Sequence, residues 1–316
     1  MAEHIKHMKD GIYEKVMSKE FADRLMEAIE AKKVWAERDD ADAYEATGYL
    51  SSYLEKLIRL CLKDIADRNT EAVLSDEIEL TNQLVEMLAE RLPDLGHGHS
   101  VVKNQFLLKS LEHVANKTSP RKWEYPDTSL TKSFLFTNSH NDTSMVSELR
   151  KEIMSADRID FLVSFIRFSG LALLLPYLRD FTNKGGHLRV ITTTYMGATD
   201  PKAVVELAKL PNTEIHISYN VKETRLHAKS YIFHRDSQFS TAYIGSSNLS
   251  HAAIAEGLEW NMKITEQDMP SIMEKMTATF ETYWNSDEFQ VFHVEQEDDF
   301  IKAIDHERGR EAVSYT

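Results

Sequence analysis

LHAKSYIFHRDSQFSTAYIGSSNLSHAAIAEGLEWN (residues 226–261) contains a His-x-Lys triplet, the turn Gly245–Asn248 and the late glutamate Glu259. HAKSYIFH and STAYIGS have the β-branched and aromatic content typical of strands. Because side chains alternate between the faces of a strand, His227 and Lys229 are predicted to project to the same side. An imidazole and an ammonium would then share one small volume, and a phosphate fits between such groups.

The chain before this stretch alternates strand patterns with helix patterns. IDFLVSFI at 159–166, HLRVITTT at 187–194 and TEIHISYN at 213–220 predict strands, and helices are predicted between them. The first of these is an apolar run without alternation, which suits a strand covered on both faces. This order predicts an α/β fold with a mixed, largely parallel sheet flanked by helices.

Three regions are predicted along the chain. Residues 1–125 form an all-helical N-terminal region, because their apolar residues recur at helical spacing, and a fourth helix is predicted near 106–114. Residues 126–290 form the α/β catalytic domain. Residues 291–316 are rich in acidic side chains and are predicted to be a tail or a linker towards a further part of a longer protein.

The composition of the 316 residues, with 42% hydrophobic and 28% charged, is that of a soluble globular protein. The opening residues are polar and no apolar run is long enough to cross a bilayer, which predicts a cytoplasmic location without a membrane partner. The single cysteine, Cys61, has no partner for an intrachain disulfide and is interpreted as a buried helix residue in a reducing compartment.

The net charge of −14 argues, taken alone, against a polyanionic partner. The segment 158–235 nevertheless contains eleven Lys and Arg against six Asp and Glu. A basic cleft inside an acidic shell is therefore predicted, and Arg167, Arg225 and Arg235 are the candidate DNA contacts. Binding through phosphate contacts would depend strongly on salt.

The residue types of the 226–261 stretch suit phosphodiester chemistry. An imidazole nitrogen can attack phosphorus and hold a phosphoryl group, and an ammonium can neutralise the non-bridging oxygens. A carboxylate that accepts the other N–H of the imidazole fixes its tautomer. The alternative is a solvated edge strand followed by a Ser/Asn turn. The order and spacing of the three elements favour the catalytic interpretation.

The same elements, His227-Ala-Lys229, Gly245-Ser246-Ser247-Asn248 and Glu259, resemble the active-site signature of the phospholipase D superfamily. The resemblance covers roughly residues 134–285. It implies that His227 is the nucleophile and that Glu259 orients it. It also implies that Lys229, Ser246 and Asn248 bind the substrate phosphate, with no metal and no cofactor.

One position departs from the superfamily pattern. An aspartate usually follows seven residues after the histidine, where this chain has His234. The loss is a modest one, because that aspartate mostly supports structure in the superfamily. Asp236, two residues later, would replace it if the strand contained a local bulge.

A wider stretch of the sequence, including ITTTYMGATDP and GLEWN, resembles the amino-terminal nuclease module of bacterial helicase-like restriction and phage-defence proteins. This resemblance implies DNA as the substrate and a helicase motor as a partner in the same protein. No Gly-x4-Gly-Lys-Ser/Thr phosphate loop occurs in the chain, so the motor itself is not within it. A fragment of such a protein is expected, and a stand-alone relative is the alternative.

A homodimer with one composite active site is also predicted. Displacement through a phosphohistidine needs a second group to protonate the leaving oxygen, and superfamily members place two His-Lys motifs face to face. The other His-x-Lys triplets, at 4–6 and 7–9, have no strand pattern and no Gly-Ser-x-Asn after them. A two-fold partner is therefore expected to supply the second motif.

Several alternatives stay open at this point. Trp260 is interpreted as a packing residue rather than a surface for stacking bases, and His97, His99 and His113 as loop residues rather than a metal site. The chain is predicted to be a metal-independent DNA endonuclease. The rivals are a catalytically silent module for DNA binding and dimerisation, and a phospholipid phosphodiesterase.

Overall fold

The computed structural model divides the chain into two compact units, residues 1–111 and 112–316, and each is described by itself. The structure describes residues 9, 12–38, 40, 42–68, 72–92, 97–104, 107–112, 123–137, 139, 143–220, 226–256 and 259–314. No helix in these residues is long and apolar enough to cross a membrane.

The first unit is helical. Its elements are α1 (Lys19–Glu30), α2 (Ala43–Arg68), α3 (Val73–Ala89) and the single turn η3 (His97–His99). Ser18 caps α1 by accepting a hydrogen bond from the Phe21 N–H at 3.3 Å. The fourth helix predicted near 106–114 is wrong for residues 107–112, the described part of that segment, which are irregular. A helix this short without a packing partner is marginal in water.

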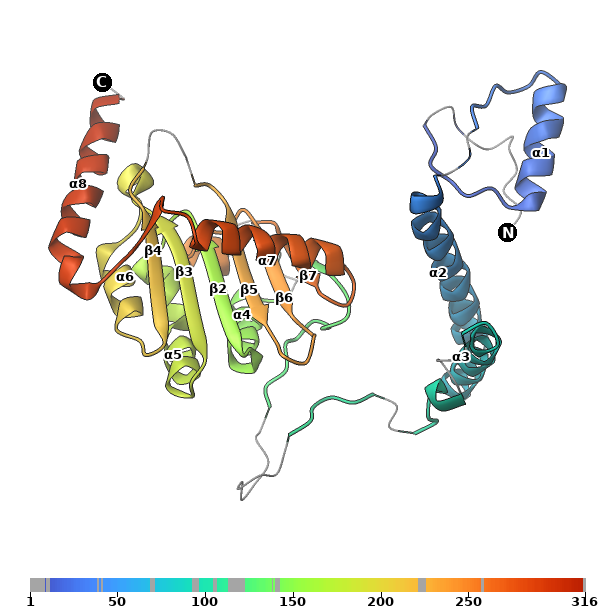
Figure 1. The fold of residues 1–316 in the computed structure, drawn as a ribbon, viewed down its shortest axis with the longest axis horizontal. Coiled ribbons are helices and arrows are strands. Elements are labelled where there is room, and N and C mark those ends of the chain that lie inside the picture. Colours follow the sequence, from blue (N-terminus) through green and yellow to red (C-terminus); the bar gives the residue numbers. More distant parts are fainter. Residues whose placement is uncertain are drawn as a thin grey trace. The chain divides into compact units, whose positions relative to one another are not determined.

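The second unit contains an eight-stranded sheet in the order β1-β7-β6-β5-β2-β3-β4-β8. Figure 1 shows the strands from β4 to β7 side by side in this order. Its strands are β1 (Phe134–Phe136), β2 (Arg158–Val163), β3 (His187–Thr193), β4 (Thr213–Ser218), β5 (Lys229–His234), β6 (Thr241–Gly245), β7 (Asn261–Thr265) and β8 (Phe289–Val291). The predicted mixed α/β sheet is confirmed. It is less parallel than predicted, because only β2, β3 and β4 run parallel. Helical crossovers join these three strands. In contrast, β5 pairs antiparallel with β2 and with β6, and β6 pairs antiparallel with β7.

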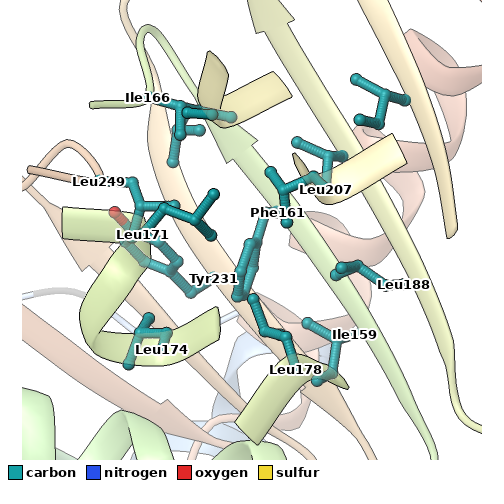
Figure 2. Packing of buried hydrophobic residues seen from close by; sticks show 14 of the residues in the cluster. Ile159, Phe161, Ile166, Leu171, Leu174, Leu178, Leu188, Leu207, Tyr231 and Leu249 are labelled. Atoms are coloured by element: carbon teal, nitrogen blue, oxygen red, sulfur yellow. The ribbon is translucent and has the colours of Figure 1, made fainter. Parts of the chain in front are cut away.

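Helices cover both faces of this sheet (Figure 1). The helices of the unit are α4 (Met145–Ser155), α5 (Phe168–Asn183), α6 (Pro201–Ala208), α7 (Pro270–Trp284) and α8 (Glu297–Ser314). Ile159 and Phe161 of β2 pack with Leu174 and Leu178 of α5 in the larger core cluster (Figure 2). Leu162, on the alternate face of β2, belongs to a second cluster with side chains of α7. β2 is therefore covered on both faces, as its apolar run predicts.

The segment 291–316 is predicted to be an acidic tail or linker, but its described part, residues 291–314, belongs to this packed unit. β8 pairs with β4 at the edge of the sheet, and α8 packs against α6. Phe300 and Ile304 of α8 are fully buried, and the Arg308 guanidinium donates to the Gly197 carbonyl at 2.9 Å. A few apolar side chains spaced along an acidic helix are enough to dock it.

A buried charge network ties α4 to the sheet. The Lys263 ammonium of β7 lies 3.0 Å from Glu148 and 2.8 Å from Glu152, and all three side chains are fully buried. Arg235 lies 2.5 Å from Glu152, and the Tyr243 hydroxyl donates to Glu152 at 2.7 Å. Burial opposes ionisation of Glu152, but Arg235 and Lys263 outweigh it and lower its pKa to about 2. The Glu152 carboxylate is thus held charged inside the protein.

Replacing Lys263 with methionine should destabilise the second unit by about 3–5 kcal/mol, because it leaves an excess of buried negative charge. Denaturant unfolding of the full chain measures the change. Lys275→Met on the exposed surface of α7 is the matched control, expected within about 0.5 kcal/mol of the wild type. A loss below about 1 kcal/mol for Lys263→Met would show that the network contributes little.

Candidate functional site

Four strand ends meet at one edge of the sheet. Val163 at the end of β2 lies opposite Lys229 at the start of β5. Gly245 at the end of β6 lies opposite Asn261 at the start of β7. β5 and β6 are themselves neighbours, so these ends are adjacent. The three sequence elements that were predicted to act together therefore lie at the same edge.

His227 and Lys229 are in direct contact. The Lys229 ammonium donates to the His227 carbonyl at 2.7 Å and lies 3.1 Å from His227 Nδ1. An ammonium has no acceptor, so Nδ1 accepts in this contact and the neutral ring carries its proton on Nε2. His227 is exposed, whereas Lys229 is only 5% exposed. Burial lowers the pKa of Lys229, while the charge of Glu259 acts in the opposite direction.

Glu259 lies close enough for its charge to act on Lys229 and on Tyr231. Its side chain is half-buried, two residues before β7. Within the described contacts no hydrogen bond joins Glu259 to His227. The structure thus places the Glu259 carboxylate at the predicted edge of the sheet. The His227 imidazole, however, contacts Lys229 and not Glu259.

Ser246 and Asn248 follow β6 at the same edge. Ser246 is exposed and its backbone pairs with Trp260, since the Ser246 N–H donates to the Trp260 carbonyl at 3.2 Å. The Trp260 N–H in turn donates to Ser246 Oγ at 3.3 Å. Asn248 is buried, and its Oδ1 accepts from the Phe165 N–H at 3.2 Å. This bond fixes the amide while its NH₂ group keeps its donors.

Two buried residues that the sequence analysis did not select, Tyr231 and Asn261, hold the Ser246–Asn248 turn through Ser247. The Tyr231 hydroxyl donates to the Ser247 carbonyl at 3.0 Å. Asn261 Nδ2 donates to Ser247 Oγ at 2.7 Å, and Ser247 Oγ donates to the Ala253 carbonyl at 3.0 Å. The alternation Lys229-x-Tyr231 is the signal in the sequence that could have identified Tyr231.

Gly245 is required by a close approach of two strands. A Cβ at this position would clash with the Trp260 carbonyl and with Asn261. Strand β7 can therefore come near enough for Ser246 and Trp260 to exchange hydrogen bonds only because residue 245 has no side chain.

Arg167 lies at the same rim. Its backbone N–H donates to the Leu249 carbonyl at 2.8 Å, next to Asn248. Its guanidinium is 42% exposed and lies 3.3 Å from the Asp200 carboxylate. The other candidate DNA contact in this region, Arg225, lies outside the described residues.

The prediction of Arg235 as a DNA contact is wrong. Arg235 follows β5 at its far end, roughly 20 Å from Lys229 at about 3.3 Å per residue. It is only 8% exposed, and its guanidinium donates to Glu152 and, at 2.7 Å, to Ser155. Its charge is used to hold α4 on the sheet, because a strand carries its first and last residues to opposite edges.

A buried carboxylate is present beside His234, and it comes from a different strand. Asp160 of β2 is fully buried and lies 2.7 Å from His234 Nε2. Arg189 donates two hydrogen bonds to Asp160, both at 2.7 Å. Burial opposes ionisation of Asp160, but the hydrogen bonds from Arg189 and His234 outweigh it and lower its pKa.

The expectation that Asp236 replaces the missing aspartate is wrong. Pairing of β5 with β2 continues without a bulge from Lys229 to His234. Asp236 is exposed in the following turn, where its N–H donates to Asp157 at 2.9 Å. A continuous strand leaves no extra residue that could bring Asp236 back into the sheet.

The loop histidines give no metal site that the structure can describe. His113 lies outside the described residues. Among the residues that are described, no three His, Cys, Asp or Glu side chains are placed to hold one metal ion.

Tyr231→Phe should loosen the Ser246–Asn248 turn, because the buried Ser247 carbonyl loses its donor at a cost of about 1–3 kcal/mol. Hydrogen exchange followed by mass spectrometry should show faster exchange in peptides that span 245–250. Tyr177→Phe on α5 is the control, since no hydroxyl partner of Tyr177 is found among the described residues. Equal protection in both variants would contradict the positioning role of Tyr231.

Comparisons with known proteins place this site in a family context. Residues 149–284, which include His227, Lys229, Ser246, Asn248 and Glu259, match the family model described as "Cardiolipin synthase, PLD-like domain". No curated protein sequence matches the chain.

Solved structures with a similar fold include two bacterial Nuc proteins. NucT from Helicobacter pylori is 18% identical, with a TM-score of 0.41, and the match covers 51% of this chain and 99% of that one. Nuc from Salmonella typhimurium, a phospholipase D family member, is 17% identical with a TM-score of 0.40 and the same coverage. Phosphatidylserine synthase from Haemophilus influenzae is 9% identical with a TM-score of 0.39, over 57% of this chain and 45% of that one. The family-model match identifies residues 149–284 as a phospholipase D-like domain.

Proposed function

We propose that this domain is a metal-independent phosphodiesterase that cleaves DNA through a phosphohistidine intermediate. The observation that carries the proposal is the meeting of His227, Lys229, Ser246, Asn248 and Glu259 at one edge of the sheet. An imidazole, an ammonium, a hydroxyl, an amide and a carboxylate are together the groups that a phosphoryl transfer needs.

Each group has a chemical task in this proposal. Lys229 and the Asn248 amide neutralise the non-bridging phosphate oxygens, and Ser246 donates from the rim. A buried ammonium is effective here, because charge interactions strengthen where water is excluded. Glu259 accepts the N–H of His227 and keeps the attacking nitrogen unprotonated.

Substrate binding would also rearrange the His227–Lys229 contact. Without substrate, Lys229 occupies Nδ1 and the proton is on Nε2. A phosphate oxygen offers Lys229 a stronger, charge-assisted partner and releases Nδ1. The proton can then move to Nδ1 and face Glu259, and Nε2 becomes the nucleophile.

The reaction then runs in two displacements. Nε2 of His227 forms a bond to phosphorus while the P–O bond to the leaving strand breaks, and that oxygen takes a proton from His227 of the partner subunit. In the second step the same partner imidazole takes a proton from water, whose oxygen attacks phosphorus and breaks the N–P bond. A homodimer with a composite site supplies both imidazoles.

An exposed tryptophan favours a nucleic acid as the substrate. Trp260 follows Glu259 directly and is 67% exposed. Its backbone carbonyl accepts from the Ser246 N–H, and its N–H donates to Ser246 Oγ. Its interpretation as a packing residue is wrong, because the close β6–β7 pairing turns it outwards. An exposed indole beside a phosphate site is a platform on which a base can stack.

The role of this nuclease in a restriction or phage-defence protein with a helicase motor remains part of the proposal. It rests on the sequence resemblance of ITTTYMGATDP and GLEWN. Co-purification of the native protein from its source would show whether a motor accompanies the domain.

His227→Ala should abolish cleavage of supercoiled plasmid in EDTA, with a rate loss of roughly 10³-fold or more, because the nucleophile is removed. Gel electrophoresis of nicked and linear products measures the rate. His187→Ala, an exposed histidine at the opposite edge of the sheet, is the matched control and should cleave like the wild type.

The possible outcomes separate the three candidate functions. Equal cleavage by the wild type and by His227→Ala would contradict the proposal. DNA binding without turnover, and without an acid-labile phosphohistidine, would instead show a silent binding module. Release of headgroup from phospholipid vesicles, with DNA left intact, would show a lipid phosphodiesterase.

Trp260→Ala should weaken binding of a single-stranded oligonucleotide by roughly 5- to 150-fold, the equivalent of about 1–3 kcal/mol for one stacked base. Fluorescence anisotropy measures the dissociation constant in a His227→Ala background, where the DNA stays intact. Trp35→Ala, a fully exposed tryptophan of the first unit, is the control. An unchanged constant for Trp260→Ala would remove the base platform from the proposal.

A further inference from the structure

The first unit leaves an apolar seam of α2 open to solvent. Leu50, Leu54 and Leu57 are 53%, 56% and 41% exposed. Cys61 is exposed as well, so its interpretation as a buried residue is wrong. These four residues, the α2 seam, are separated by four, three and four positions. This is the heptad spacing of helices that pack against one another along their length.

The apolar face of α2 is wider than the seam alone. Ile58 and Leu60 flank it and are 39% and 45% exposed. Glu55 and Arg59 lie on the opposite side of the helix, where they form an ion pair. Apolar residues at the seam and on both of its flanks are typical of a helix inside a bundle and not of one on a surface.

The first unit does not bury a core by itself. Among its described residues only Ile78 is buried, although α3 packs against α2. Domains of this size normally bury well over half of the surface that the unfolded chain exposes. A contiguous apolar stripe of this kind marks an interaction site.

We infer that two copies of the chain associate through their α2 helices in antiparallel orientation. In the register that joins seam to seam, Leu54 lies opposite Leu57 of the partner subunit, and Leu50 lies opposite Cys61 of the partner subunit. The two-fold axis repeats both contacts, which gives a closed, self-complementary interface.

The charges of α2 select this orientation. Residues 42–55 contain three acidic side chains and no basic one, whereas residues 56–68 contain four basic and two acidic ones. Antiparallel pairing places the acidic half of each helix beside the basic half of the other, and it opposes the helix dipoles. Parallel pairing would place Asp64 and Arg68, the next seam positions, beside their own copies.

This association goes beyond the proposed chemistry and does not depend on it. It uses only residues of the first unit. It would hold two phospholipase D-like domains in one particle, whichever substrate they act on.

Disulfide cross-linking of the full chain tests the register directly, because Cys61 is the single cysteine. Leu50→Cys should give a disulfide-linked dimer under mild oxidation, since residue 50 faces Cys61 of the partner subunit. The wild type should stay uncross-linked, because the two Cys61 residues lie on opposite sides of the two-fold axis. Ser52→Cys, on the polar side of α2, is the matched control and should also stay uncross-linked.

Light scattering of Leu57→Glu and Ser52→Glu gives a second readout. Leu57→Glu buries a charge in the seam and should raise the dimer dissociation constant at least 10-fold. Ser52→Glu adds the same charge on the polar side of α2, within its acidic half, and should not raise the constant. Circular dichroism checks that both variants keep their helices. A Cys61–Cys61 cross-link in the wild type would overturn the antiparallel register. A monomeric Leu50→Cys protein without cross-links would show that another part of the chain covers the seam.

Failure of this inference is distinct from failure of the proposed function. Cleavage in EDTA that requires His227, without any cross-link in Leu50→Cys, would overturn only the α2 pairing. A cross-linked Leu50→Cys dimer whose DNA cleavage survives His227→Ala would overturn only the phosphodiesterase.

Discussion

The antiparallel register of β2, β5, β6 and β7 is the constraint on which the candidate site depends. It sets Lys229 opposite Val163 and Gly245 opposite Asn261, so that the ends of four strands coincide. Side chains alternate along a strand, so a slip of one residue would turn Lys229 to the α7 face. Burial enforces the register, because Tyr231 and Phe233 fill the core on the same side as Lys229. The packing that stabilises the sheet therefore also orients the Lys229 ammonium.

Some basic side chains of the second unit stabilise the fold, and others are left for the candidate site. Arg235 and Lys263 neutralise the carboxylates of α4, and Arg189 neutralises Asp160. These cations are held by buried partners and cannot serve a distant phosphate. A basic excess counted along the chain thus overstates the positive potential at the active edge. Within the described residues, the groups left for an anion there are Lys229, the partly exposed Arg167 and neutral hydrogen-bond donors.

The two units differ in how they satisfy their apolar side chains. The second unit buries two clusters of them, one on each face of its sheet. The first unit exposes the leucines of α2, and a second copy is the partner that its charge pattern fits. Self-association through α2 and a composite phosphodiesterase site would both require two chains in one particle.

The sequence by itself determined the helical first region, the mixed α/β class and the sharing of one edge by His227, Lys229, Ser246, Asn248 and Glu259. These follow from periodicity and from spacing within neighbouring strands, which are local properties. Tertiary structure decided the antiparallel pairings, the docking of α8, the burial of Arg235 and the exposure of Trp260. It also brought Asp160 of β2 beside His234 of β5. Each of these depends on which distant residue a side chain meets, and one chain's local pattern contains no such information.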